Sequence, residues 1–74
     1  MTVTIRAGSW ARRFIPEVTV LTLDEGALLS DALAALPIPE DEVGPAVIEG
    51  LVARGDRKLC EGDEIEIYPS IIGG

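Results

Sequence analysis

The chain closes with the stretch Glu64-Ile65-Glu66-Ile67-Tyr68-Pro69, followed by Ser70-Ile71-Ile72-Gly73-Gly74. Ile65 and Ile67 alternate with polar neighbours, a period of two that predicts a β-strand with one buried and one solvated face. The turn-forming run Glu61-Gly62-Asp63 precedes this strand, and Leu59 before it is expected to anchor in the core. The final strand should therefore be well formed and should deliver the last residues outward from the body.

The glycine pair at the end is the most informative feature of this stretch. Because glycine has no Cβ, Gly73 and Gly74 can adopt almost any backbone conformation and enter a channel too narrow for other residues. The Gly74 carboxylate could then be activated in the active site of another protein, which makes it the expected reactive group. The alternative is that the glycines are only a floppy end of the chain.

Length and composition argue against an enzyme. The 74 residues make one small domain, which buries only about 60% of the surface that the unfolded chain exposes. There is no histidine, and the single cysteine, Cys60, allows neither an internal disulfide nor a cysteine-rich zinc site. The acidic side chains of Glu64 and Glu66 should lie on the open face of the strand. We therefore expect no metal and no bound cofactor.

The net charge of −7 favours a protein partner with a basic surface, since nucleic acid and anionic membranes repel an acidic chain. The alternative is that the charge only keeps a small domain soluble. The first residues alternate at once and lack the apolar stretch of a signal peptide. No run reaches the ~20 apolar residues of a membrane span. A cytoplasmic location is expected.

Hydrophobic periodicity predicts the other elements of the fold. Strands are expected around Val3 and Ile5, from Val18 to about Leu23, and at Ala46-Val47-Ile48, with a short return strand at Leu51-Val52-Ala53 after the tight turn Glu49-Gly50. One long helix, with Asp24 as a candidate cap, is expected from the apolar residues at helical spacing, Leu28, Leu29, Ala32, Leu33 and Leu36. Pro37 and Pro39 should end it. Strands packed on one face by a single long helix make an α+β roll.

Five segments share their residues and spacing with a known family: Trp10-Ala11-Arg12-Arg13-Phe14-Ile15-Pro16, Asp24-Glu25-Gly26 before the helix, Val47-Ile48-Glu49-Gly50, Leu59-Cys60-Glu61-Gly62-Asp63-Glu64-Ile65, and Tyr68-Pro69-Ser70-Ile71-Ile72-Gly73-Gly74. Along its whole length the chain resembles the small β-grasp, ubiquitin-like sulfur carriers, which include the molybdopterin synthase small subunit and the thiamine sulfur carrier. Three positions depart from the family pattern. Glu49 replaces an asparagine, Ser70 replaces a second proline, and Ile72 is bulkier than usual.

The resemblance implies a fold and a chemistry. Residues 1–70 would form a β-grasp roll, a mixed sheet on one main helix, and residues 71–74 a flexible diglycine tail. An E1-like enzyme would use ATP to adenylate Gly74, and a sulfur donor would replace AMP to leave a thiocarboxylate. The chain would be a protein co-substrate or the small subunit of a molybdopterin synthase, with its tail in the large subunit.

The resemblance also suggests which residues dock partners. Tyr68, Pro69, Ile71 and Ile72 would enter a partner groove, and an acidic patch of Glu61, Asp63, Glu64 and Glu66 would meet basic residues of the activating enzyme. The alternative is that Tyr68 and Pro69 simply end an edge strand and the isoleucines are ordinary exposed residues.

Three functions other than pterin synthesis stay open at this point. The chain could be the thiamine sulfur carrier that serves thiazole synthase, a ubiquitin-like modifier that forms an isopeptide bond to a lysine, or an interaction module whose tail is inert. The aromatic–proline pair Tyr68-Pro69 resembles the ending of the pterin branch, so molybdopterin or tungstopterin synthesis is the expectation.

Overall fold

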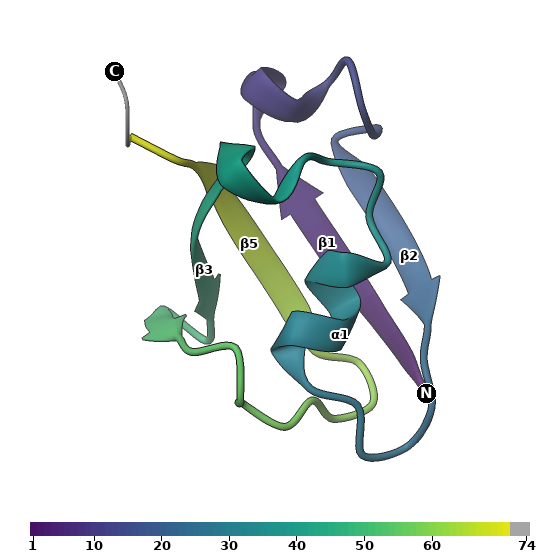
Figure 1. The fold of residues 1–74 in the computed structure, drawn as a ribbon. Coiled ribbons are helices and arrows are strands. Elements are labelled where there is room, and N and C mark those ends of the chain that lie inside the picture. The colour runs from purple at the N-terminus through teal and green to yellow at the C-terminus, as the bar shows by residue number, and fades with distance from the viewer. Residues whose placement is uncertain (72–74) are drawn as a thin grey trace.

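The computed structural model describes residues 1–71 and shows a five-stranded sheet with a helix on one face (Figure 1). The strands are β1 (Thr2–Ala7), β2 (Val18–Thr22), β3 (Val43–Ile48), β4 (Leu51–Ala53) and β5 (Glu64–Pro69), and the helix is α1 (Leu29–Ala34). Two 3₁₀ turns, η1 (Ser9–Ala11) and η2 (Glu40–Glu42), precede β2 and β3. The predicted strands are all present, so the α+β roll is confirmed.

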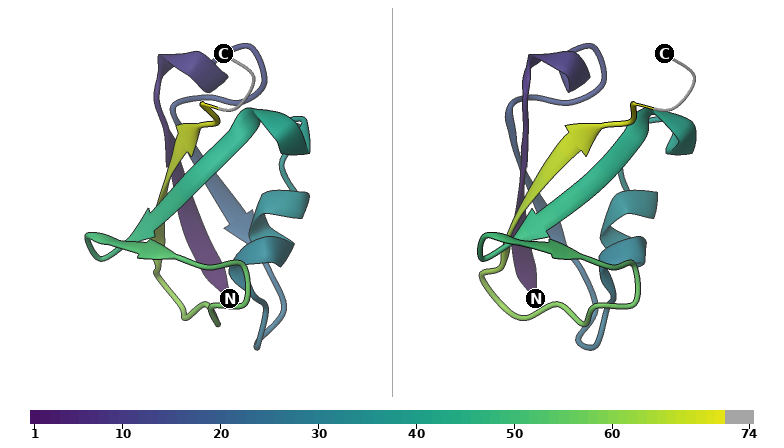
Figure 2. Two further views of the ribbon diagram at one scale, coloured as in Figure 1. Left: turned by 60° about the vertical axis from the view of Figure 1, so that its left-hand side comes forward. Right: turned by 90° about the vertical axis from the view of Figure 1, so that its left-hand side faces the viewer.

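The sheet is mixed, with strand order β2-β1-β5-β3-β4. β1 runs parallel to β5, while the β1–β2, β3–β5 and β3–β4 pairs are antiparallel. β5, the last strand of the sequence, therefore lies at the centre of the sheet, and its final residues emerge beside the start of β3 (Figure 2).

Alternation along the strands builds the core under α1. Buried side chains point to one face of the sheet from the three central strands: Val3, Ile5, Ala7, Ala46, Ile48, Ile65 and Ile67. Leu29 and Ala32 pack on them from α1. Leu59 is also buried, as the sequence predicted, and closes the core beneath the loop before β5. The polar residues of β5, including Glu64 and Glu66, are exposed on the opposite face.

The helix is much shorter than predicted, because both of its ends are held by other interactions. Before it, Leu28 forms an isolated bridge with Lys58, and the N–H of Leu29 donates to the carbonyl oxygen of Arg57 at 2.9 Å. After it, Pro37 disfavours helical backbone at the residue that precedes it. Only six residues, Leu29–Ala34, are left in α-helical conformation.

The prediction that Asp24 caps the helix is wrong. The carbonyl oxygen of Asp24 accepts the N–H of Ala27 at 3.1 Å, which makes a separate turn several residues before α1. The helix start is held instead by Asp31, whose Oδ2 accepts the N–H of Leu28 at 2.8 Å. Within residues 1–71, no helix has the length and hydropathy that crossing a membrane requires.

Candidate functional site

The end of β5 fixes the place where the chain leaves the folded body. Pro69 pairs with Val43 at the start of β3, and the N–H of Ser70 donates to the carbonyl oxygen of Glu42 at 3.0 Å. One residue later, Ile71 is 90% exposed. The predicted tail residues Ile72, Gly73 and Gly74 lie outside the described residues.

Tyr68 and Glu66 lie next to this exit on the open face of the sheet. The two side chains are two residues apart on β5, and the Tyr68 hydroxyl donates to Glu66 Oε2 at 3.3 Å. Tyr68 is 45% exposed, and Pro69 is also exposed. The structure thus brings together three of the predicted docking residues, Glu66, Tyr68 and Pro69, in the last four residues of β5, shortly before Ile71.

Glu64 is already engaged inside the protein. Its Oε1 accepts a charge-assisted hydrogen bond from Arg6 Nε at 2.8 Å across the β1–β5 pair. This hydrogen bond and the charge of Glu64 raise the pKa of the Arg6 guanidinium above its ordinary value. Glu64 is therefore already paired with a cation of its own chain, whereas Glu66 makes no ion pair among the described residues.

Glu61 and Asp63 lie at the opposite end of β5 from the exit. Glu61 Oε1 accepts the N–H of Thr2 at 2.9 Å, and Asp63 Oδ2 accepts the N–H of Cys60 at 2.8 Å. β5 is six residues long, so at ~3.3 Å per residue its first and last Cα atoms are roughly 17 Å apart. Of the predicted acidic patch, Glu61 and Asp63 therefore lie before the strand, while Glu64 and Glu66 are two residues apart on its open face. Residues 1–71 contain no group of three or more acidic or cysteine side chains arranged to hold a metal ion.

Two hollows flank the exit. A shallow hollow of about 310 Å³ lies on the Tyr68 side and is lined by Arg6, Ala7, Gly8, Trp10, Glu17, Glu66, Ile67 and Tyr68. Within the described residues, the buried Nε1 of Trp10 has no hydrogen-bond partner.

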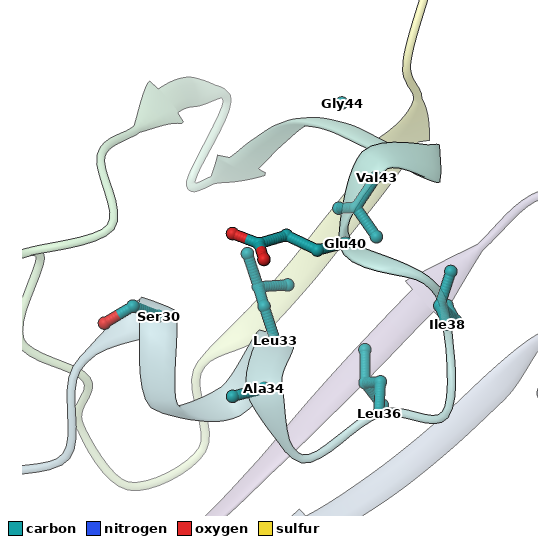
Figure 3. A pocket seen from close by; sticks show the side chains of 8 residues that line it. All are labelled: Ser30, Leu33, Ala34, Leu36, Ile38, Glu40, Val43 and Gly44. Carbon is teal, nitrogen blue, oxygen red and sulfur yellow. The ribbon is translucent and has the colours of Figure 1, made fainter.

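A larger groove of about 610 Å³ lies on the other side of the exit, between α1 and β3 (Figure 3). Its lining residues are Ser30, Leu33, Ala34, Leu36, Ile38, Glu40, Val43 and Gly44. Sequence reasoning missed this groove, because its walls come from segments whose contact depends on the tertiary fold. The only sequence signal was the acidic loop from Glu40 to Glu42, set between apolar residues.

The strand order and the single helix on one face define a ubiquitin-like β-grasp protein. Residues 11–72 match the family model described as Mut7-C ubiquitin, and the chain belongs to that family. The predicted resemblance to ubiquitin-like proteins is thereby confirmed. No curated protein matches the sequence at a significant level.

Three solved structures with the same fold come from Pyrococcus furiosus and Haloferax volcanii. A putative molybdopterin converting factor, subunit 1, from Pyrococcus furiosus superposes with a TM-score of 0.80 at 18% identity, covering 96% of this chain and 99% of that one. SAMP1 from Haloferax volcanii gives a TM-score of 0.77 at 19% identity over the full length of both chains. A second structure of that small archaeal modifier protein 1 gives 0.78 at 16% identity, covering 95% of this chain and 98% of that one. At these identities the likeness shows the fold.

Proposed function

We propose that this protein is a ubiquitin-like sulfur carrier, in which Gly74 is adenylated, converted to a thiocarboxylate and used as the sulfur source for molybdopterin or tungstopterin synthesis. The observation that carries the proposal is the exit geometry. After the central strand, a backbone hydrogen bond joins Ser70 to Glu42, and the exposed Ile71 follows. The sequence then continues with Ile72-Gly73-Gly74, a segment suited to a narrow channel.

The proposed chemistry has two steps. A Gly74 carboxylate oxygen attacks the α-phosphorus of ATP bound by the E1-like enzyme, and pyrophosphate leaves. A hydrosulfide equivalent then attacks the acyl carbon of the adenylate, AMP leaves with the electrons of the broken C–O bond, and a thiocarboxylate remains. The chain itself supplies the carboxylate and the docking surface, while the partners supply the nucleotide site and the proton transfers.

The pterin pathway is proposed on two grounds. The Tyr68-Pro69 ending resembles the pterin branch, and one structure of the same fold is described as a molybdopterin converting factor subunit. In this pathway the tail would enter the large subunit of a synthase. Tyr68, Pro69 and Ile71, which are exposed, would contact that subunit around the tail.

A ubiquitin-like modifier is the second candidate, favoured by the likeness to small archaeal modifier protein 1. Both candidates share the adenylation step and differ in the nucleophile that follows it. A hydrosulfide equivalent gives the thiocarboxylate, whereas a lysine amine gives an isopeptide bond.

Intact-mass analysis of the protein purified from its own cells tests both candidates. A chain that ends at Gly74 with one oxygen replaced by sulfur supports the carrier, and a chain joined through Gly74 to lysines supports the modifier. A chain that continues beyond Gly74 would overturn both.

Purified E1-like enzymes from the same organism, tested in turn with ATP, provide the second assay. We expect one of them to release pyrophosphate with the wild-type chain but not with a chain that lacks Gly74. The thiocarboxylate is then supplied to a pterin synthase and to a thiazole synthase side by side. Efficient thiazole formation without a pterin product would reassign the pathway.

A further inference from the structure

The groove between α1 and β3 has one carboxylate in its lining, and this group is not paired within the described residues. Glu40 reaches over the hollow, and its side chain runs from beside Val43 to a carboxylate above Leu33 (Figure 3). Among residues 1–71 this carboxylate has no hydrogen-bond or ion-pair partner. Its neighbour Glu42 differs, because Glu42 Oε1 accepts a 2.6 Å bond from Arg13.

The other walls of the groove are mainly apolar. Leu33 and Val43 are partly buried and pack against the core, Ala34 is exposed beside them, and Leu36 and Ile38 form the deeper part of the lining. An apolar channel with one free carboxylate at its rim matches a side chain with an aliphatic stem and a positive end. Lysine and arginine bury such stems while their charged ends remain near water or a counter-ion.

The groove is continuous with the exit of the tail. Its β3 wall contains Val43, which pairs with Pro69, and Gly44, which lies against Pro69 and Ser70. An enzyme that takes up the tail must cover Ser70 and Ile71, so its surface reaches the end of the groove that Val43 and Gly44 form. The overall charge of −7 favours a basic surface at this contact.

We propose that this groove receives a lysine or arginine side chain of the E1-like enzyme, with the cation at Glu40 and the aliphatic stem along Leu33, Ala34 and Val43. The inference rests on the proposed function for the identity of the partner. The chemistry of the occupant rests only on the groove.

The first test uses hexylammonium as a probe and follows the methyl NMR signals of Leu33, Ala34 and Val43. We expect saturable shifts that disappear in Glu40→Gln and are absent with hexanoate, which has the same stem and the opposite charge. Shifts of equal size in Glu40→Gln, or spread equally over acidic residues elsewhere such as Glu49, would overturn the proposal.

The second test measures adenylation kinetics with two neighbouring alanines as a matched pair. Ala34 and Ala35 are both exposed, but only Ala34 lines the groove. Ala34→Gln should fill the channel and lower kcat/KM about tenfold, mainly through KM, as expected when a buried contact is blocked. Ala35→Gln should stay within about twofold of wild type, as a surface substitution does.

Glu40→Gln removes only the charge and should lower kcat/KM by about two- to fivefold, with the loss shrinking at high salt. Equal rates for Ala34→Gln and Ala35→Gln would refute the groove contact even if the wild-type chain is a good substrate. If no E1-like enzyme adenylates the wild-type chain, the proposed function fails, while the hexylammonium titration still decides whether the groove binds a cationic side chain.

Discussion

Gly44 lies directly against Pro69, so closely that a Cβ on Gly44 would overlap the carbonyl oxygen of Pro69. The same Cβ would stand 2.8 Å from the Pro69 carbonyl carbon and 3.0 Å from the backbone nitrogen of Ser70. Gly44 falls within the register shift of the β3–β5 pair, between Val43 and Ala46. The missing side chain therefore allows β5 to pass close to β3 and sets the position from which the tail leaves.

Gly44→Ala should destabilise the protein and disturb the tail exit. The new methyl group meets backbone atoms, which cannot rotate away, so a loss of about 1–3 kcal/mol in the free energy of unfolding is expected. Denaturant unfolding checks this value. Gly55→Ala is the control, because a Cβ at Gly55 makes an ordinary 3.5 Å contact with Ser30. Equal stability of the two variants would show that the close approach at Gly44 is not important.

Glu49→Asn should stabilise the protein. Glu49 has a φ of 54° and Gly50 a φ of 77°, so both central residues of the β3–β4 turn are left-handed. This backbone is unfavourable for most L-residues, whereas asparagine adopts it readily in such hairpins. A gain of about 0.5–1 kcal/mol in thermal or denaturant unfolding is expected. Glu49→Gln removes the same charge without the conformational relief and should gain less. A gain as large in Glu49→Gln would assign the effect to charge.

The fold could be predicted largely because the strands carry their own pattern. Ile65 and Ile67 in β5, and Val3 and Ile5 in β1, alternate with polar residues, and all four are buried as predicted. The turn at Glu49 was also predicted. Glu49 adopts left-handed backbone in this turn, a conformation that is unfavourable for glutamate.

The helix and the candidate site show where sequence reasoning failed. Helical periodicity cannot register that Leu28 is held by Lys58, thirty residues away in the sequence, so α1 was predicted too long. Strand alternation placed Glu64 and Glu66 on one face correctly, but it could not show that Arg6 from a neighbouring strand already pairs with Glu64. The groove beside Glu40 was missed for the same reason, since tertiary contacts create it.

Asp63→Ala should lower stability more than partner binding. Asp63 Oδ2 accepts the N–H of Cys60, so it holds the turn that leads into β5, and its loss should reduce the free energy of unfolding by about 1 kcal/mol. Glu61→Gln is the control, because the amide oxygen can still accept the N–H of Thr2. Unfolding of the two variants is compared by circular dichroism. Wild-type stability of Asp63→Ala together with weaker partner binding would restore Asp63 as a docking residue.

Charged and apolar residues around the exit should affect different rates of partner binding: the charged residues the association rate, and the apolar residues the dissociation rate. Glu66 lies next to the exit and bonds only to Tyr68 among the described residues, whereas Glu64 is paired with Arg6. Charge reversal in Glu66→Lys should therefore slow association with the E1-like enzyme by roughly three- to tenfold at low salt, since exposed charges mainly accelerate encounter.

The matched reversal Glu64→Lys has a different expected effect, because it also releases Arg6 and leaves two cations on neighbouring strands. Its association rate should fall as well, and the variant should lose more stability than Glu66→Lys, which also places a cation opposite Arg6 but breaks no hydrogen bond with it. Ile71→Ala removes an exposed apolar side chain at the exit and should instead raise the dissociation rate, with association unchanged. Stopped-flow binding across a series of salt concentrations measures both rates. If Glu66→Lys associates at the wild-type rate at every ionic strength, the acidic residue at the exit serves solubility alone; if Ile71→Ala dissociates at the wild-type rate, the partner does not bury the start of the tail.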